Sequence, residues 1–91
     1  MDGQKYRLAL SPQFERILKS LKRKKPSLLA ELDRAISKVF REPIFGKPLR
    51  HSMRNYRRVH IGSFVLVYEV YANEIRLLDF DHHDRIYKKY Q

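Results

Sequence analysis

The sequence predicts an α+β domain of the order β-α-α-β-β-β, in which a helical hairpin packs on one face of an antiparallel sheet. Two observations favour this class: apolar residues recur with a helical period between residues 12 and 42 and with the alternating period of strands beyond residue 43. The chain length is a third observation, because 91 residues with 43% apolar content provide one hydrophobic core and no room for another. We therefore expect a single domain over residues 1–91.

The N-terminal part of the chain predicts a short strand and a first helix. Apolar side chains alternate over residues 6–10, and Ser11 and Pro12 then supply a helix N-cap and a proline at the first helical position. The helix should end by Lys25, because the residue before Pro26 is pushed out of the helical conformation. Its apolar stripe consists of Phe14, Ile17, Leu18 and Leu21.

A second helix is expected from Pro26 to about Glu42, and Pro43 closes it. Its apolar face is formed by Leu28, Leu29, Leu32, Ala35, Ile36, Val39 and Phe40. Two consecutive helices joined by a tight turn form a hairpin. Residues 44–49 contain the glycine and proline of a connecting loop.

Three strands should follow this loop. They are expected at residues 56–61, 64–71 and 74–80, with turns at Gly62-Ser63 and Ala72-Asn73. Such short turns join antiparallel neighbours, so we expect a meander with helices on one face and the working surface on the other. Residues 81–91 are polar and aromatic without an apolar stripe, which predicts a loop carrying a short C-terminal helix at most.

The composition favours a polyanionic partner. Lys and Arg number 20 against 10 Asp and Glu, a net charge of +10 with a pI near 10.2, which favours nucleic acid. The absence of cysteine excludes disulfides, a cysteine-based zinc site and thiol catalysis. The longest apolar run, residues 64–68, is far too short for a membrane span, and no signal peptide is visible, so we expect a cytoplasmic protein with no membrane partner.

The segment of residues 47–60 is the most charge-biased part of the chain and contains no acidic residue. Side chains two apart on a strand share a face, so placing Val59 and Ile61 in the core leaves Arg58 and His60 on the open face. A solvated sheet edge explains such a segment equally well. His60 adds a side chain that exchanges protons near neutral pH.

The four histidines require an explanation. His82 and His83 are adjacent and would not face the same way on a strand, and no metal-binding spacing is present, so we expect no metal ion and no other cofactor. Antiparallel pairing would instead bring His60 beside His82 or His83 for acid-base chemistry. We expect His51 and His82 to be surface residues.

Several short motifs follow one another in a characteristic order. They are Ser11-Pro12-Gln13-Phe14, Lys47-Pro48-Leu49, the strand from Tyr56 to Gly62, and the closing His83-Asp84-Arg85-Ile86-Tyr87. In this order the chain resembles the RelE/ParE superfamily of toxins from type II toxin-antitoxin modules, and within it the RelE/YafQ-like mRNA interferases. The resemblance implies a RelE-like fold, metal-free endoribonuclease activity on mRNA in the ribosomal A site, and silencing by a cognate antitoxin that wraps around the toxin.

The resemblance also implies site residues. The YafQ-like pattern has catalytic histidines before the glycine turn and before a terminal Asp-x-x-aromatic motif, which correspond to His60 and His83. The RelE-like pattern has two basic residues on the same strand and a terminal tyrosine, which correspond to Arg58, His60 and Tyr87. The further residues expected to bind RNA are Lys47, Arg50, Arg54, Arg57 and Arg85.

Cleaving RNA without a metal requires a base for the ribose 2′-OH, cations for the charge on the phosphorane and an acid for the departing 5′-oxygen. His60 and His83 would supply the base and the acid, and Arg58 a bidentate phosphate contact. Tyr87 would orient or stack on a base, or else anchor the C-terminal segment in the core. Asp84 is expected to cap a helix or to form a surface ion pair.

Two positions depart from the family patterns. RelE-like members have an arginine at the position of Val65, and YafQ-like members have a histidine at the position of Lys47, so the set is mixed and predicts a low rate. A second basic block at residues 19–25 is either a solvated face or a contact for ribosomal RNA or an acidic antitoxin.

Two alternatives to an mRNA interferase stay open. One is a ParE-like inhibitor that shares the fold, binds DNA gyrase and has no ribonuclease activity. The other is a non-catalytic basic nucleic-acid-binding module or a decayed toxin. The presence of both His60 and His83 favours the ribonuclease, because an inhibitor needs no paired proton carriers.

Overall fold

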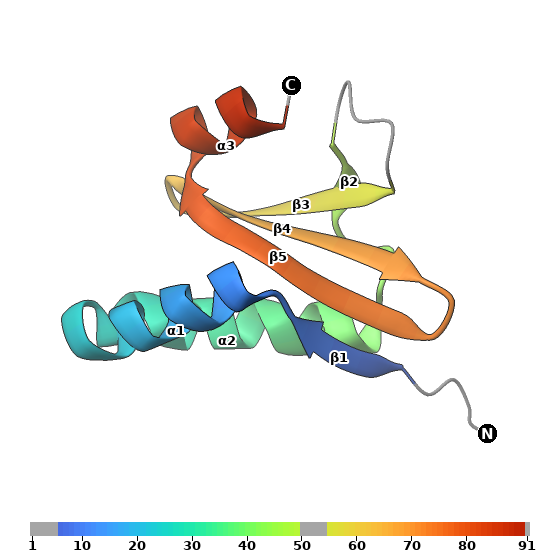
Figure 1. Ribbon diagram of the computed structural model, residues 1–91, viewed down its shortest axis with the longest axis horizontal. Helices are drawn as coiled ribbons and strands as arrows, with labels where there is room; N and C mark the ends of the chain where they lie inside the picture. Colours follow the sequence, from blue (N-terminus) through green and yellow to red (C-terminus); the bar gives the residue numbers. More distant parts are fainter. Residues whose placement is uncertain (1–5, 50–54, 91) are drawn as a thin grey trace.

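In the computed structural model, which describes residues 6–49 and 55–90, a sheet lies between two helical layers (Figure 1). The elements are β1 (Arg7–Leu10), α1 (Pro12–Lys24), α2 (Pro26–Arg41), β2 (Lys47–Pro48), β3 (Tyr56–Ile61), β4 (Phe64–Tyr71), β5 (Glu74–His82) and α3 (His83–Lys89). The α+β class, the helical hairpin and the short C-terminal helix are confirmed. Two elements differ from the prediction: β2 lies within the expected loop, and β5 continues to His82.

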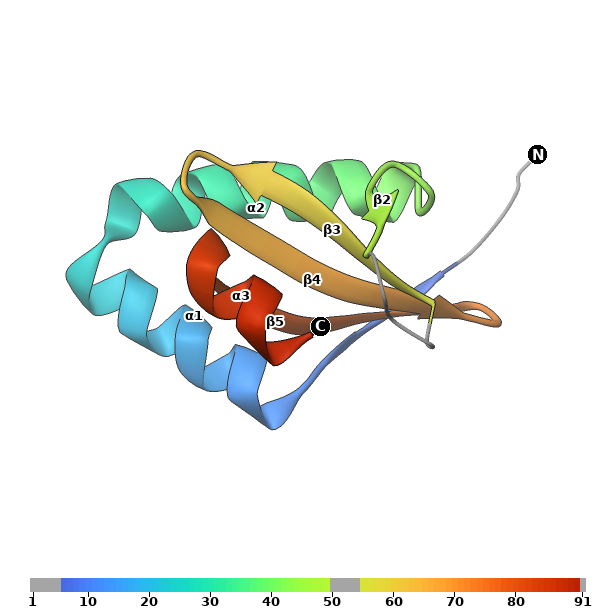
Figure 2. The ribbon, with the colours of Figure 1, turned by 90° about the horizontal axis from the view of Figure 1, so that it is seen from above.

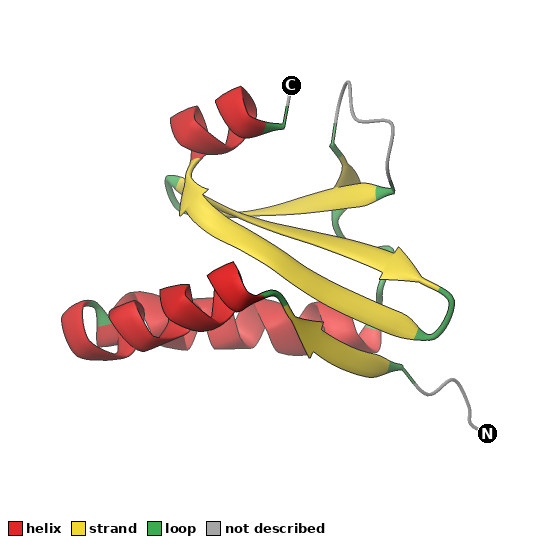
Figure 3. Cartoon of the chain, viewed as in Figure 1, coloured by secondary structure: helices red, strands yellow, loops and turns green. Residues whose placement is uncertain are grey.

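The sheet has five strands in the order β1-β5-β4-β3-β2 (Figure 3). β3, β4 and β5 form the predicted antiparallel meander. Gly62 and Ala72 adopt positive φ angles of 62° and 54° in the connecting turns, as two-residue hairpins require. At one edge β1 pairs with β5 in parallel, so the sheet is mixed rather than fully antiparallel, and β2 extends the other edge beside β3.

The helical hairpin covers one face of this sheet (Figure 1). Ser11 caps α1, because its Oγ accepts a hydrogen bond of 2.9 Å from the N–H of Phe14, and Pro12 occupies the first position as predicted. α1 ends at Lys24, in agreement with the effect of Pro26. The core between hairpin and sheet consists of Phe14, Leu21, Leu32, Val39, Ile61, Leu66, Tyr68, Ile75, Leu77 and Phe80.

The opposite face carries α3 (Figure 2), so it is not the bare working surface that the sequence suggested. Ile86 of α3 is fully buried in a second core cluster with Leu49, Val65 and Val67. A seven-residue helix with one fully buried side chain has no repeating apolar stripe, which is why periodicity does not reveal its packing. None of the helices in the described part of the chain is long and apolar enough to cross a membrane.

A β-bulge changes the facing of side chains along β5. Val67 of β4 pairs with Asp79 and Tyr68 pairs with Leu77, so Leu78 is an additional residue on β5. Leu77 therefore packs with the helical hairpin, whereas Asp79 lies on the side of α3, opposite Val67. Without the bulge, strict alternation would turn the Asp79 carboxylate into the main core.

Candidate active site

β3 and α3 bring a histidine and a tyrosine together on the α3 side of the sheet. The hydroxyl oxygen of Tyr87 lies 3.1 Å from Nε2 of His60. As predicted, Val59 and Ile61 pack toward the helical hairpin, and His60 faces the other way. Its partner across the ladder is Val65, which is fully buried in the second core cluster. The His60–Tyr87 contact thus lies next to closely packed core side chains.

Cationic side chains surround His60. Lys47 of β2 pairs in register with Arg58, which precedes His60 by two residues on the same face of β3. The pKa of His60 is lowered, first by the partial burial of the ring and then by the charges of Arg58, His83 and Lys47. Its imidazole is therefore neutral at pH 7 and can accept a proton. A pocket of about 330 Å³ beside it is lined by Phe45, Gly46, Lys47, Arg58, Val59 and His60.

His83 occupies the first turn of α3. Its backbone N–H donates a 2.9 Å hydrogen bond to the carbonyl of Ser63, in the turn that follows β3. This contact holds the start of α3 against the end of the strand that carries His60, and the charge of His83 acts on the pKa of His60. The structure therefore places the four residues expected to be catalytic on one side of the sheet: Arg58, His60, His83 and Tyr87.

The donor atoms of His82, His83 and Asp84 lie within 4.8 Å of one another, a group that could hold a metal ion. The expectation that the adjacent histidines face apart was wrong, because the chain passes from β5 into α3 between them and their rings are 4.3 Å apart. Asp84 lies 3.0 Å from Nδ1 of His83 and 3.7 Å from Nδ1 of His82, the ion-pair alternative considered for it. The helix cap is His82, which accepts from the N–H of Asp84 at 3.3 Å.

The loop that precedes Lys47 is fixed by a buried tyrosine. The hydroxyl of Tyr68 donates to the carbonyl of Pro43 and accepts from the N–H of Gly46, each at 2.8 Å. Burial raises the pKa of Tyr68, so it remains a neutral phenol. Sequence reasoning assigned Tyr68 to a core strand and missed this role, because its partners lie more than 20 residues away in the chain.

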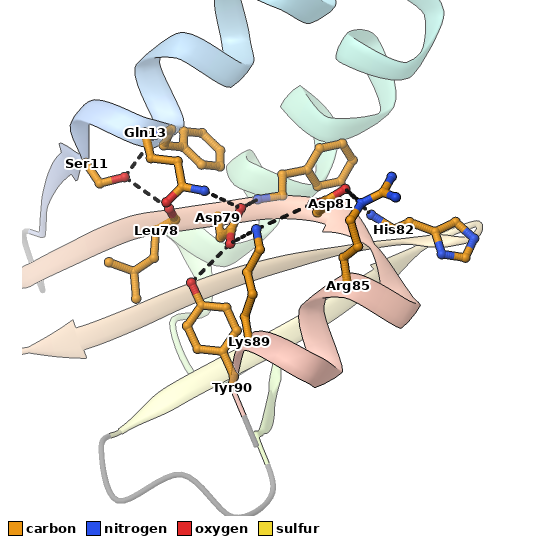
Figure 4. A network of polar contacts seen from close by, with 11 residues as sticks. Ser11, Gln13, Leu78, Asp79, Asp81, His82, Arg85, Lys89 and Tyr90 are labelled. Carbon is orange, nitrogen blue, oxygen red and sulfur yellow. Dashed lines mark hydrogen bonds and ion pairs between the residues drawn. The ribbon is translucent and has the colours of Figure 1, made fainter.

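A second network fixes the end of α3 (Figure 4). The carboxylate of Asp79 is 1% exposed and accepts hydrogen bonds from Lys89 Nζ at 2.9 Å and from the Tyr90 hydroxyl at 3.1 Å. The pKa of Tyr90 is raised by burial and then by the charge of Asp79. Sequence reasoning missed this network. The available signal was an acidic residue between the apolar Leu78 and Phe80 of the predicted strand.

Other predicted RNA-binding residues are placed differently. Arg57 lies on the other face of β3, where its guanidinium donates to the carbonyls of Ile44 and Gly46. Arg85 forms an ion pair of 2.9 Å with Asp81, whose pKa is lowered by hydrogen bonds from Arg85, His82 and Lys89 against the opposing effect of burial. The structure brings neither arginine to the His60 pocket. Arg50, His51 and Arg54 lie outside the described residues.

The two departures from the family patterns occupy different environments. Val65 is fully buried under α3, so an arginine here would have to displace part of the second core cluster. Lys47 is exposed and lines the His60 pocket with a basic side chain. At the second basic block, residues of α1 line a shallow groove together with Arg16, which precedes the block: Lys19, Ser20, Lys22 and Arg23.

Comparisons with known proteins agree with this architecture. The model of a family described as the ParE toxin of the type II toxin-antitoxin system, parDE, matches residues 8–87. A Methanocaldococcus jannaschii protein described as "Putative toxin RelE4" is 37% identical over 87 residues, which cover 92% of this chain and 93% of that protein.

Two solved structures show the same fold. The toxin-antitoxin complex RelBE2 from Mycobacterium tuberculosis matches with a TM-score of 0.70 and 27% identity, covering 86% of this chain and 98% of that chain. YafQ from E. coli matches with a TM-score of 0.72 and 19% identity, covering 91% and 99%.

Proposed function

The chain belongs to the RelE/ParE superfamily of toxins of type II toxin-antitoxin systems, and from this premise we propose that it is a metal-independent, ribosome-dependent endoribonuclease that cleaves mRNA. The observation that carries the proposal is the contact between His60 and Tyr87 beside a cationic pocket. A neutral imidazole next to fixed positive charges is suited to remove a proton from a ribose bound through its phosphate.

In the proposed reaction His60 removes the proton of the 2′-hydroxyl, and the 2′-oxygen attacks the adjacent phosphorus. When Nε2 of His60 carries a proton toward Tyr87, Nδ1 is the basic nitrogen. The phosphorane gains negative charge, which Arg58 and Lys47 stabilise. The bond to the 5′-oxygen then breaks, and His83 donates the proton that this oxygen takes up. The products are a 2′,3′-cyclic phosphate and a free 5′-hydroxyl.

The proposed partners are mRNA on the ribosome, in the cytoplasm, and separately a cognate antitoxin that silences the toxin. The solved RelBE2 complex contains a toxin with its antitoxin. A net charge of +10 favours an acidic partner, and a partner segment that folds on contact covers a large cationic surface. Co-expression with the neighbouring open reading frame should yield a stable complex and relieve growth arrest. A neighbour that neither binds nor relieves toxicity would contradict this assignment.

The direct test is inducible expression followed by primer-extension mapping of transcripts, together with single-turnover cleavage of ribosome-bound mRNA. His60→Ala and His83→Ala should each lower the rate by about 10² or more, the scale of lost acid-base catalysis. Lys88→Ala is the control, because it truncates an exposed side chain of α3 outside the proposed reaction, and should retain activity. Chelation by EDTA should not stop cleavage while the ribosome stays intact. Wild-type rates in both active-site variants would refute the assignment.

A ParE-like gyrase inhibitor is the second candidate, favoured by the match to the ParE toxin family model. An inhibitor would block supercoiling by purified DNA gyrase and leave transcripts uncut. Its effect would also survive His60→Ala, because binding needs no proton transfer.

A further inference from the structure

The His60–Tyr87 contact depends on the position of a very short helix. α3 has seven residues, and an isolated helix of this length is not stable in water. Its start is held by the hydrogen bond from His83 to Ser63, and its middle by the burial of Ile86. Tyr87 follows Ile86 directly, so the direction of the last turn decides where its hydroxyl points.

The last turn is held by Asp79, whose surroundings are specialised. Besides Lys89 and Tyr90, its carboxylate accepts from the N–H of Phe80 at 2.8 Å and from Gln13 Nε2 of α1 at 3.4 Å (Figure 4). All four groups are donors, so the buried carboxylate is fully engaged. Lys89 also contacts Asp81 at 3.4 Å, and these two carboxylates raise its pKa against the effect of burial.

The bulge at Leu78 makes this arrangement possible. It turns Asp79 toward α3, and the carbonyl of Leu78 accepts a 3.0 Å hydrogen bond from Ser11 Oγ, the same atom that caps α1. The start of α1, the bulge and the end of α3 therefore form one connected polar network. A buried carboxylate in a strand is costly, and β-bulges commonly serve to re-aim a side chain near a functional site.

We propose that Asp79, Lys89 and Tyr90 form a positioning unit, the carboxylate latch, which orients the last turn of α3 so that the Tyr87 hydroxyl meets His60. This inference rests on the proposed function in that His60 and Tyr87 belong to the reacting centre. None of the three latch residues touches the substrate; each acts through Tyr87. The latch predicts that loosening Asp79 or Tyr90 changes the environment of His60 while the fold persists.

The first measurement does not depend on cleavage of RNA. The titration of the His60 ring is followed by NMR in the full chain and in Tyr90→Phe, Asp79→Asn and Tyr87→Phe. The groups around His60 are Arg58 on β3, Lys47 on β2, and His83 and Tyr87 on α3. Releasing α3 withdraws the cover of Tyr87 and the charge of His83, so the pKa of His60 should rise toward 6.5 in both latch variants. Lys88→Met is the control, because it changes an exposed side chain of the same turn that takes no part in the latch, and should leave the titration unchanged.

The second measurement is a double-mutant cycle in single-turnover cleavage. Tyr90→Phe should lower the rate about 10-fold in the wild-type background, since a small misplacement of a reacting group is costly, and should have almost no further effect in Tyr87→Phe. An equal loss in both backgrounds, or a His60 titration that both latch variants leave unchanged, would overturn the latch. If the chain cleaves no RNA, the proposed function fails and the NMR titration still decides the latch. Tyr90→Phe keeps the test valid if Asp79→Asn does not fold.

Discussion

Replacing Ile86 with alanine tests whether α3 is a structural part of the domain. Ile86 is 0% exposed and packs against Leu49, Val65 and Val67. The substitution removes three buried carbon atoms, worth about 0.8 kcal/mol each in transfer free energy, and leaves a cavity that adds to the loss. We expect the free energy of unfolding to fall by about 3–4 kcal/mol, within the range measured for such truncations.

This loss is large for a domain of this size. Small domains have a free energy of unfolding of about 5–15 kcal/mol, and 1 kcal/mol corresponds to a shift in Tm of roughly 4–8 °C. The assay is urea unfolding followed by circular dichroism, with a common m-value for wild type and variant. Ile44→Ala is the matched control, because Ile44 is 76% exposed and its truncation should change the stability by less than about 0.5 kcal/mol.

Equal effects of the two truncations would refute the second core cluster. Cleavage gives a second comparison of the two variants. Ile86→Ala should lower the cleavage rate more than Ile44→Ala, because it loosens the helix that carries Tyr87. A stable Ile86→Ala variant with wild-type cleavage would show that α3 holds its place without this side chain.

Three further predictions follow from the site. Arg58→Gln should move the acidic limb of the pH profile of the cleavage rate to higher pH. Removing the guanidinium raises the pKa of His60, so the base becomes protonated at a higher pH during acidification. An unchanged acidic limb would contradict the assignment of His60 as the base. Affinity for ribosomes or RNA should fall steeply between about 50 and 200 mM salt, and Lys47→Glu with Arg58→Glu should weaken it more than Lys24→Glu with Lys25→Glu, as measured by filter binding; a flat salt dependence would exclude electrostatic binding. Gly46→Ala should lower the free energy of unfolding in urea by about 1–3 kcal/mol. The added Cβ would lie 2.7 Å from the Tyr68 hydroxyl oxygen and 2.9 Å from the Arg58 carbonyl oxygen. An unfolding midpoint equal to that of the wild type would show that the loop adapts to the added methyl group.

The elements with a strong period were predictable from the sequence. The stripes of α1 and α2, the cap at Ser11 and the meander of β3 to β5 follow from local rules, and so does the placement of Arg58 and His60 on one face. The parallel pairing of β1 was not predicted, because it joins Arg7 to Glu74 and depends on how the whole chain closes.

The site was predictable only in part, for the same reason. His60, His83 and Tyr87 were identified by strand alternation and by family resemblance, and the structure places them on one side of the sheet. The roles of Tyr68 and Asp79 depend on partners elsewhere in the chain and on a bulge, which shifts alternation by one residue. No local pattern encodes such a shift.

The pairing of β1 with β5 has a consequence for synthesis. Residues 7–10 pair in register with residues 74–77, so this edge of the sheet stays open until most of the chain has left the ribosome. The proposed catalytic pair likewise joins β3 to the later α3. Chains grow at about 5–20 residues per second, and long-range pairing folds slowly. Under the proposed function, the nascent chain therefore stays inactive until these distant segments pair, and this interval gives the proposed antitoxin time to bind.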